Sequence, residues 1–396
     1  MLVYSIQEIG DTMLNKINQR VIPIEIPGIR YFSNQVVEME NGVNLTIGEP
    51  DFPTPENVKQ AGIQAIENNQ TGYSHNAGML GVREEVSAFF HDIYQCYYDP
   101  QKEVLITNGA SEALDSTLRT ILTAGDEVIL TAPIYSAYES LIELNGGKVV
   151  YLDTTNNNFK PDPDVLESLI TNKTKAIILN YPSNPTGATL NQEETAALAN
   201  TLQKYDIFVI SDEIYSENTY HQKHVSFASY KNLRNQLFLV HGLSKSHAMT
   251  GWRVGFLLGP GYLIEQVLKV HLNNSICTSL PSQYAAIEAL SNSRKSPETM
   301  NGSYIKRRNY VVDRLKQMDI EIVLPNGAFY IFPFIKKFGL SSFDFATRLL
   351  HSKHVAVVPG SSFSIYGEGY IRISYANSIQ QLAIAMDRLE EFLQDI

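Results

Sequence analysis

Seven short runs of apolar, often β-branched residues recur between residues 104 and 258, and this series constrains the fold more than any other feature of the chain. Most of the runs are almost continuously apolar, which is typical of strands covered by helices on both faces of a largely parallel sheet. Helical patterns lie between them; Leu114, Leu118 and Ile121, for example, share one helix face. The sequence therefore predicts an α/β fold with a doubly wound, mostly parallel seven-stranded sheet. The predicted strands are VLIT (104–107), EVILT (127–131), KVVYL (148–152), KAIILN (175–180), IFVIS (207–211), LFLVH (237–241) and VGFLL (254–258).

A chain of 396 residues is long enough for one large and one smaller domain. A short helix is expected from Gln7 to Asn18, before the Pro- and Gly-containing stretch VIPIEIPGIR. We expect residues 47–286 to form the large domain, and residues 1–46 to pack with a smaller α+β domain formed by 287–396. In the small domain the pattern predicts helices over 299–318, 343–351 and 379–393 and strands over 327–333, 355–360 and 371–375.

Composition and charge exclude several classes of function. The net charge is −11, so the chain lacks the basic surface that a nucleic-acid partner requires. No apolar run approaches the length of a membrane span, and the start MLVYSIQEIGDTML lacks the basic region of a secretory signal. Two cysteines cannot build a disulfide framework. We therefore expect a cytoplasmic protein with no membrane or nucleic-acid partner.

Two pairs of histidines have helix-like spacing, His221 with His224 and His351 with His354. A zinc site needs three or four ligands, and no companion cluster accompanies either pair. We interpret them as solvated histidines and predict no metal site.

Unusual polar sequences follow four of the predicted strands. They are NGASEALDS after VLIT, YPSNPTG after KAIILN, DEIY after IFVIS and GLSK after LFLVH. Ligands of open parallel sheets bind at the carboxyl ends of the strands, which lie at one edge. We therefore expect these four segments to form a single site.

The fourth segment, HGLSKSHAMTGWR (241–253), carries the strongest chemical signal. Lys245 supplies an amine able to form a Schiff base, and Arg253 supplies a fixed cation able to hold a phosphate. A lone lysine in a loop is nearly always a solvated charge, but here Gly242, Ser244 and Arg253 accompany it at a strand end. Few chemistries need this pair, and pyridoxal 5'-phosphate is the leading one.

The segment DEIY places Asp212 at the end of a buried strand, where a carboxylate is costly unless it is paired. Opposite a pyridine nitrogen, Asp212 would keep that nitrogen protonated, and Tyr215 could bond the phenolic oxygen of the same ring. Taken alone, a strand-end aspartate more often caps the next helix.

Four further candidates are weaker when each is taken alone. The turn at Gly109–Ser111 opens a helix, so its N–H groups and the Ser111 hydroxyl could bind an anion, although an ordinary helix start has the same pattern. Asn184 in YPSNPTG could turn its amide toward a ligand oxygen. Arg372 in YIRIS could grip a substrate carboxylate bidentately, or be a surface arginine on an edge strand. Tyr135 could stack on a cofactor ring, in a chain that has 22 tyrosines.

Together these segments resemble the class I/II aminotransferases of the fold-type I pyridoxal-phosphate superfamily, over nearly the whole chain from about residue 20. SNPTG, DEIY and SKxxxxTGWRxG at these separations are highly specific as a set. The other landmarks are NLTIGEPDFPTP, GYSHNAG, TNGASEALD, PIYSAYE, PNGAFYIFP, VPGSSF and IRISYA. The resemblance implies an enzyme that uses pyridoxal phosphate to move an amino group between an amino acid and a 2-oxo acid.

The resemblance also implies a role for each matching residue around the cofactor ring. Lys245 forms the Schiff base, and Asp212 pairs with the ring nitrogen. Tyr215 and Asn184 bond the ring oxygen, and Tyr135 stacks on the ring.

Phosphate binding is implied for Arg253, Ser111 and the amide of Ala110 in the Gly109 turn, with Ser244 as a possible helper. The chain departs from the family pattern at Gly242, three residues before Lys245, where some relatives have a phosphate-binding serine.

Substrate binding is implied for Gly48 and Arg372, which meet the carboxylate, with Asn184 beside them. Tyr73 in GYSHNAG would reach the phosphate in the neighbouring subunit, which implies a homodimer with shared active sites. Tyr135 stands where aspartate-specific relatives have tryptophan.

Within the family, GIRYFSN, GLSKSHAMTGWR and FGLSSFDF are most similar to the bacterial enzymes that act on N-acetyl-L,L-diaminopimelate in lysine biosynthesis, with glutamate as amino donor. Aromatic and aspartate aminotransferases of the same subgroup are the alternatives. A carbon–sulfur β-lyase with the same cofactor stays open, because the reaction type depends on how the substrate is oriented.

Overall fold

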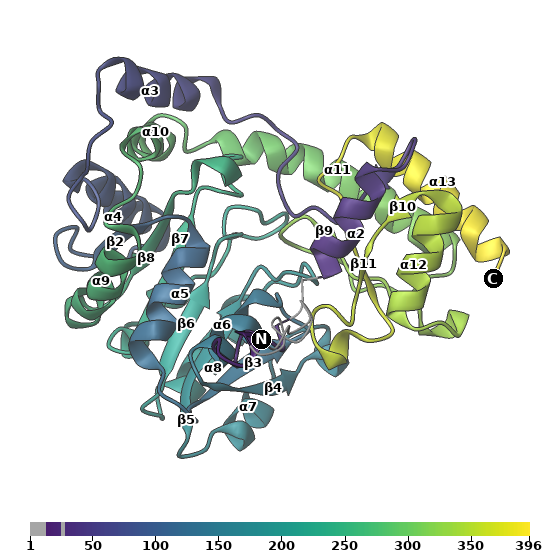
Figure 1. Cartoon of the computed structure of the whole chain (residues 1–396), viewed down its shortest axis with the longest axis horizontal. Coiled ribbons are helices and arrows are strands. Elements are labelled where there is room, and N and C mark those ends of the chain that lie inside the picture. The colour runs from purple at the N-terminus through teal and green to yellow at the C-terminus, as the bar shows by residue number, and fades with distance from the viewer. Residues whose placement is uncertain (1–12, 25–27) are drawn as a thin grey trace, which may run out of the picture.

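The computed structural model describes residues 13–24 and 28–396, and its largest element is a seven-stranded sheet with the order β2-β8-β7-β6-β5-β3-β4 (Figure 1). β8 runs antiparallel to both of its neighbours, and all other neighbouring strands are parallel. The predicted α/β fold with a mostly parallel seven-stranded sheet is thus confirmed. The strands are β2 (Val104–Thr107), β3 (Glu127–Ala132), β4 (Lys148–Asp153), β5 (Thr174–Asn180), β6 (Phe208–Asp212), β7 (Leu237–Gly242) and β8 (Gly255–Leu258).

Both faces of this sheet are buried, which is why its strands are almost continuously apolar. Ile177 and Val209 belong to one hydrophobic cluster, and their neighbours Ile178 and Ile210 belong to another on the opposite face. The first cluster includes residues of α3 (Glu56–Glu67), α4 (Leu80–Tyr94), α7 (Pro163–Leu169), α8 (Gln192–Leu202) and α10 (Leu280–Ser291). The second includes residues of α5 (Ala110–Ile121), α6 (Ala137–Leu144) and α9 (Gly261–Ser275).

A third hydrophobic cluster joins the C-terminal part of the chain to its N-terminal segment. In Figure 1, α2 lies beside α11, α12 and α13, away from the large sheet, and α2 contacts β1, β10 and β11. The division of the chain at residues 47 and 287 stays a prediction. The helices are α2 (Gly28–Val37), α11 (Ser296–Gln317), α12 (Ser342–Lys353) and α13 (Ile379–Gln394), and the strands are β1 (Val43–Asn44), β9 (Tyr330–Ile331), β10 (Val355–Ala356), β11 (Val358–Pro359) and β12 (Ile371–Ser374).

The short strands of this part differ from those that the sequence predicts. The strand expected over 327–333 is reduced to β9, because Ala328 has a φ of 53°, which an extended strand does not accommodate. The strand expected over 355–360 divides into β10, which pairs with β1, and β11, which pairs with β12 in a different sheet. Of the helix expected from Gln7 to Asn18, residues 7–12 lie outside the described residues.

In the part of the chain that the structure describes, no helix is long and apolar enough to cross a membrane.

Candidate active site

The four polar segments that follow β2, β5, β6 and β7 meet at one edge of the large sheet. There they border a cavity of about 680 Å³. Every site residue predicted from the sequence lines this cavity except Gly109, which directly precedes the lining residue Ala110, and Tyr73. The residues brought together are Gly48, Ala110, Ser111, Tyr135, Asn184, Asp212, Tyr215, Ser244, Lys245, Arg253 and Arg372.

Lys245 lies three residues beyond the end of β7, and its Nζ donates a hydrogen bond to the carbonyl oxygen of Gly48 at 2.6 Å. The pKa of Lys245 is lowered to about 8, mainly by burial; Arg372 and Arg253 act in the same direction, and Glu49 and Asp212 oppose them. A substantial fraction of the amine is therefore neutral near physiological pH, and a neutral amine is a nucleophile and a base.

Asp212 is the last residue of β6 and is 4% exposed. Its Oδ2 accepts a hydrogen bond from the Tyr138 hydroxyl at 2.6 Å, and its Oδ1 accepts one from the N–H of Ile214 at 3.1 Å. Burial raises the pKa of Asp212 to about 6, and the hydrogen bond from Tyr138 opposes that rise. Both partners are uncharged, so the carboxylate is suited to a cationic group placed in the cavity. The helix-capping alternative is wrong for this aspartate, because its oxygens bind a neighbouring turn and a tyrosine.

Arg372 on β12 is 1% exposed, and the partners of its guanidinium are also uncharged. Nη1 donates to Oδ1 of Asn184 at 2.8 Å, and Nη2 donates to the carbonyl of Thr46. Nε is buried without a partner among the described residues, and burial lowers the pKa of Arg372. The surface-arginine alternative is therefore wrong. A buried cation without a counterion is strongly suited to binding a carboxylate.

Further hydrogen bonds connect the groups around the cavity. Asn180, at the end of β5, donates from Nδ2 to the backbone oxygen of Asp212 at 3.1 Å, and its Oδ1 accepts from the N–H of Asn184 at 3.0 Å. The hydroxyls of Tyr215 and Tyr330 lie 2.6 Å apart. A Cβ at Gly48 would collide with the Tyr330 hydroxyl, so only glycine leaves room for this contact.

The start of α5 forms an anion cradle. Gly109 is its N-cap with a φ of 85°, and the first helical N–H groups, those of Ala110 and Ser111, have no acceptor within the helix. Nη2 of Arg253 donates to the carbonyl of Asn108 at 3.3 Å, and Nη1 donates to the carbonyl of Thr250 at 2.8 Å. These bonds hold a guanidinium beside the free N–H groups, as phosphate binding requires.

Of the last two predicted residues, Tyr135 lines the cavity and Tyr73 does not. Tyr73 lies on the segment before α4 and is 81% exposed, so within one chain it does not contribute to the cavity. Tyr135 lines the cavity with its ring at 88° to that of Tyr138.

Several cavity residues were not predicted from the sequence: Tyr138, Asn180, Tyr330, Arg30 and Glu49. For Tyr138 a signal existed, because it lies only three residues after the predicted Tyr135, in the first turn of α6. Asn180 ends a predicted strand of the sheet. Arg30, on the far N-terminal α2, had no spacing signal at all.

The interpretation of the histidines needs one correction. The side chain of His224 is not solvated but 6% exposed, and its Nε2 lies 2.8 Å from the carboxylate of Glu213. Among the described residues, no group of three or more His, Cys, Asp or Glu side chains could hold a metal ion.

The groups in the cavity fit pyridoxal 5'-phosphate. A partly neutral amine can condense with its aldehyde, a buried carboxylate without a counterion can face its ring nitrogen, and the start of α5 with Arg253 can hold its phosphate. Arg372, whose hydrogen-bond partners among the described residues are all uncharged, is then left for a substrate carboxylate.

Comparisons with known proteins agree with this geometry. The profile of the class I and II aminotransferases matches residues 40–389. A probable N-acetyl-LL-diaminopimelate aminotransferase of Bacillus subtilis is 49% identical over 381 residues, which cover 96% of each chain. The solved aromatic aminotransferase of Pyrococcus horikoshii has a TM-score of 0.88 and 38% identity, covering 92% of this chain and 99% of its own. The aspartate aminotransferase of Thermus thermophilus, solved with maleate, has a TM-score of 0.90 and 33% identity, covering 95% and 99%. The chain therefore belongs to the class I and II aminotransferases, which use pyridoxal 5'-phosphate to transfer an amino group between an amino acid and a 2-oxo acid.

Proposed function

We propose that this aminotransferase acts on N-acetyl-L,L-diaminopimelate, with glutamate and 2-oxoglutarate as the second amino acid and 2-oxo acid pair, in lysine biosynthesis. The 49% identity to the Bacillus subtilis relative, over 96% of the chain, supports this substrate. One observation above all carries the catalytic roles: Lys245, Asp212 and Arg372 come from three separate elements and line one cavity.

Pyridoxal phosphate, when bound, supplies an aldehyde for an amine and an electron-withdrawing ring that stabilises negative charge at the substrate Cα. Lys245 is the residue that binds the cofactor covalently. Its free Nζ would take the proton from the substrate Cα, because an amine with a pKa of about 8 is partly neutral at working pH.

Asp212 holds the proton on the ring nitrogen, and Tyr138 keeps the Asp212 carboxylate oriented by its 2.6 Å hydrogen bond. Tyr215 and Asn184 would bond the ring oxygen, and Tyr135, which lines the same cavity, would stack on the ring.

Gly109, Ala110, Ser111, Ser244 and Arg253 hold the phosphate. Arg372 binds the α-carboxylate with Gly48 and Asn184 beside it, and so orients the Cα–H bond toward Lys245.

Arg30 is the residue that would recognise an acidic substrate. Glutamate and N-acetyl-diaminopimelate both carry a second carboxylate, which needs a second cation. The exposed Arg30 side chain lines the same cavity as Arg372. Burial raises the pKa of Tyr135, and the charges of Arg372, Arg30 and Arg253 oppose that rise, so these three cations all lie near this ring.

The proposal includes a homodimer in a cytoplasmic setting, in which Tyr73 completes the phosphate site of the neighbouring subunit. The high exposure of Tyr73 in a single chain supports this role, since an exposed tyrosine is available to another subunit.

A substrate panel tests the function. We expect the highest kcat/KM for N-acetyl-L,L-diaminopimelate with 2-oxoglutarate, compared with aspartate, phenylalanine and their oxo acids. Arg30→Gln should lower kcat/KM for the acidic substrates at least tenfold, as the loss of one charge-assisted contact predicts. The kcat/KM for phenylalanine should change by less than about twofold. Arg348→Gln, which removes an exposed arginine of α12, is the matched control.

Two results would contradict the proposal. A preference for phenylalanine or aspartate would assign the chain to the aromatic or aspartate enzymes. Release of pyruvate from cystathionine without any added 2-oxo acid would favour the carbon–sulfur β-lyase.

A further inference from the structure

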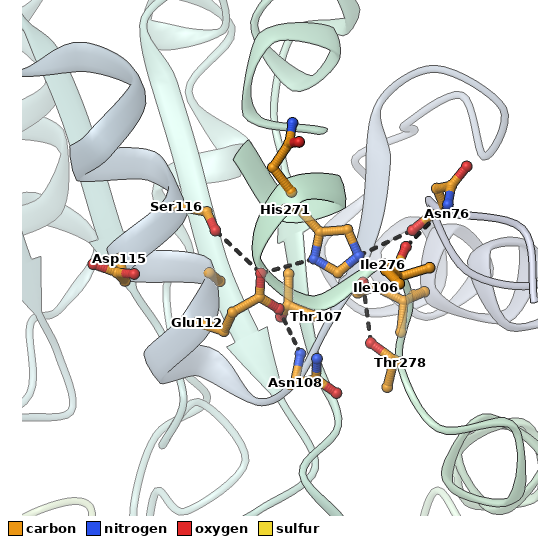
Figure 2. Close-up of polar contacts among 12 residues, drawn as sticks. Asn76, Ile106, Thr107, Asn108, Glu112, Asp115, Ser116, His271, Ile276 and Thr278 are labelled. Carbon is orange, nitrogen blue, oxygen red and sulfur yellow. Dashed lines mark hydrogen bonds and ion pairs between the residues drawn. The ribbon is translucent and has the colours of Figure 1, made fainter. Parts of the chain in front are cut away.

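A buried ion pair lies behind the anion cradle, and none of the roles given above uses it. Nδ1 of His271 on α9 lies 2.7 Å from Oε1 of Glu112, in the first turn of α5, and their side chains are 0% and 9% exposed (Figure 2). Nε2 of the same ring lies 3.0 Å from the carbonyl oxygen of Asn76. The pair therefore connects three segments that are distant in sequence.

Further hydrogen bonds surround the pair. Glu112 accepts two further hydrogen bonds, from the N–H of Asn108 at 2.7 Å and from the Ser116 hydroxyl at 3.1 Å. An ionised carboxyl group can only accept hydrogen bonds, and so can the carbonyl oxygen of Asn76. Both nitrogens of His271 then face oxygens that can only accept, so both bonds form only when the ring carries two protons.

The two ends of this network reach functional segments. Asn108 is held twice, because its N–H donates to Glu112 and its carbonyl accepts from Arg253. Asn76 lies three residues after Tyr73, and its Nδ2 donates to the carbonyl of Ile276 just beyond α9. The start of α5 and the Tyr73 segment are thus attached to the same imidazole ring, as Figure 2 shows for Glu112 and Asn76.

A buried pair of ionisable side chains is a poor source of stability, because the cost of removing polar groups from water offsets their attraction. It does impose a geometry, since its hydrogen bonds form in one arrangement only. We propose that Glu112 and His271 are positioning residues, which set the phosphate cradle at the start of α5 and the Tyr73 segment relative to each other. The inference rests on the proposed role of that cradle.

The phosphate group of the cofactor provides the test. Protein stripped of cofactor is titrated with pyridoxal phosphate and with pyridoxal, which has the same aldehyde and ring but no phosphate. We expect Glu112→Ala and His271→Gln to raise the Kd for pyridoxal phosphate roughly tenfold or more. The Kd for pyridoxal should change less than about twofold. An equal loss of affinity for both ligands, or no loss of affinity for either, overturns the proposal.

Glu112→Gln is the conservative variant. Its amide oxygen can accept from Asn108, while its nitrogen donates to a singly protonated His271 and to the Ser116 hydroxyl, so each contact is kept without charge. We expect the Kd of this variant for pyridoxal phosphate to stay within about threefold of the wild-type value. A loss as large as that of Glu112→Ala would contradict positioning by these bonds. Glu56→Gln, which breaks an exposed ion pair with Lys59 on α3, is the control.

Ser111→Ala and Arg253→Gln separate this inference from the one on which it rests. If these variants keep the full preference for pyridoxal phosphate over pyridoxal, the cradle itself is wrongly assigned. If they lose the preference while Glu112→Ala and His271→Gln keep it, the cradle stands and only the positioning role fails.

Discussion

Replacing Lys245 with methionine should remove a pH-dependent cost to the stability of the cofactor-free protein. Burial lowers the pKa of Lys245 from its ordinary 10.5 to about 8. The difference corresponds to about 3 kcal/mol, at roughly 1.4 kcal/mol per pH unit. The unfolded chain binds the proton more tightly than the folded chain, so between these two pH values the free energy of unfolding of the wild type rises with pH. The cost is fully present below about pH 8 and disappears above 10.5.

The assay is urea unfolding of both cofactor-free proteins at a fixed protein concentration, at a series of pH values. The quantity to compare is the free energy of unfolding of the wild type minus that of Lys245→Met. We expect this difference to rise by about 3 kcal/mol between about pH 7 and pH 10.5. Other titrating groups are common to both proteins and cancel, and so does the lost hydrogen bond to Gly48, which adds a nearly constant term.

Lys306→Met is the control, because Lys306 is exposed on α11. The free energy of unfolding of the wild type minus that of Lys306→Met should not change with pH. If the difference in free energy of unfolding between the wild type and Lys245→Met also stayed constant, or fell as pH rose, the amine would not be desolvated as the structure indicates. Lys245 would then lack the neutral fraction on which its catalytic role depends.

Three further results are expected. Arg372→Ala should cost roughly 1.5–3 kcal/mol of substrate binding, seen mainly as a higher KM, and an unchanged KM would move the carboxylate site elsewhere. Asp212→Ala should retain some pyridoxal phosphate but lose most activity, because the ring nitrogen loses the partner of its proton; a kcat close to that of the wild type would speak against this pairing. Mixed dimers of Tyr73→Phe and Lys245→Ala chains should regain activity, because one of their two sites then combines an intact lysine with an intact tyrosine from the other chain. Mixed dimers no more active than the two parent variants would show that Tyr73 does not act across a subunit interface.

The large sheet was predictable because its strands carry a strong local signal. Strands buried on both faces are continuously apolar, and β2 to β8 begin and end within about one residue of the predicted runs. The strands of the smaller part of the chain are only two to four residues long, and pairing with distant segments defines them. β10, for example, exists because Val355 pairs with Val43. No local sequence pattern predicts that contact.

By itself, the sequence determined which segments carry the chemistry and that they meet. Lys245, Asp212 and Asn184 follow strands whose common direction places their carboxyl ends at one edge of the sheet. Only the tertiary structure decided the contacts that tune them. Tyr138 and Asp212 are 74 residues apart in the chain, and Glu112 and His271 are 159 apart. Such contacts arise from the packing of side chains between separate elements. No periodicity or spacing in a single sequence reveals them.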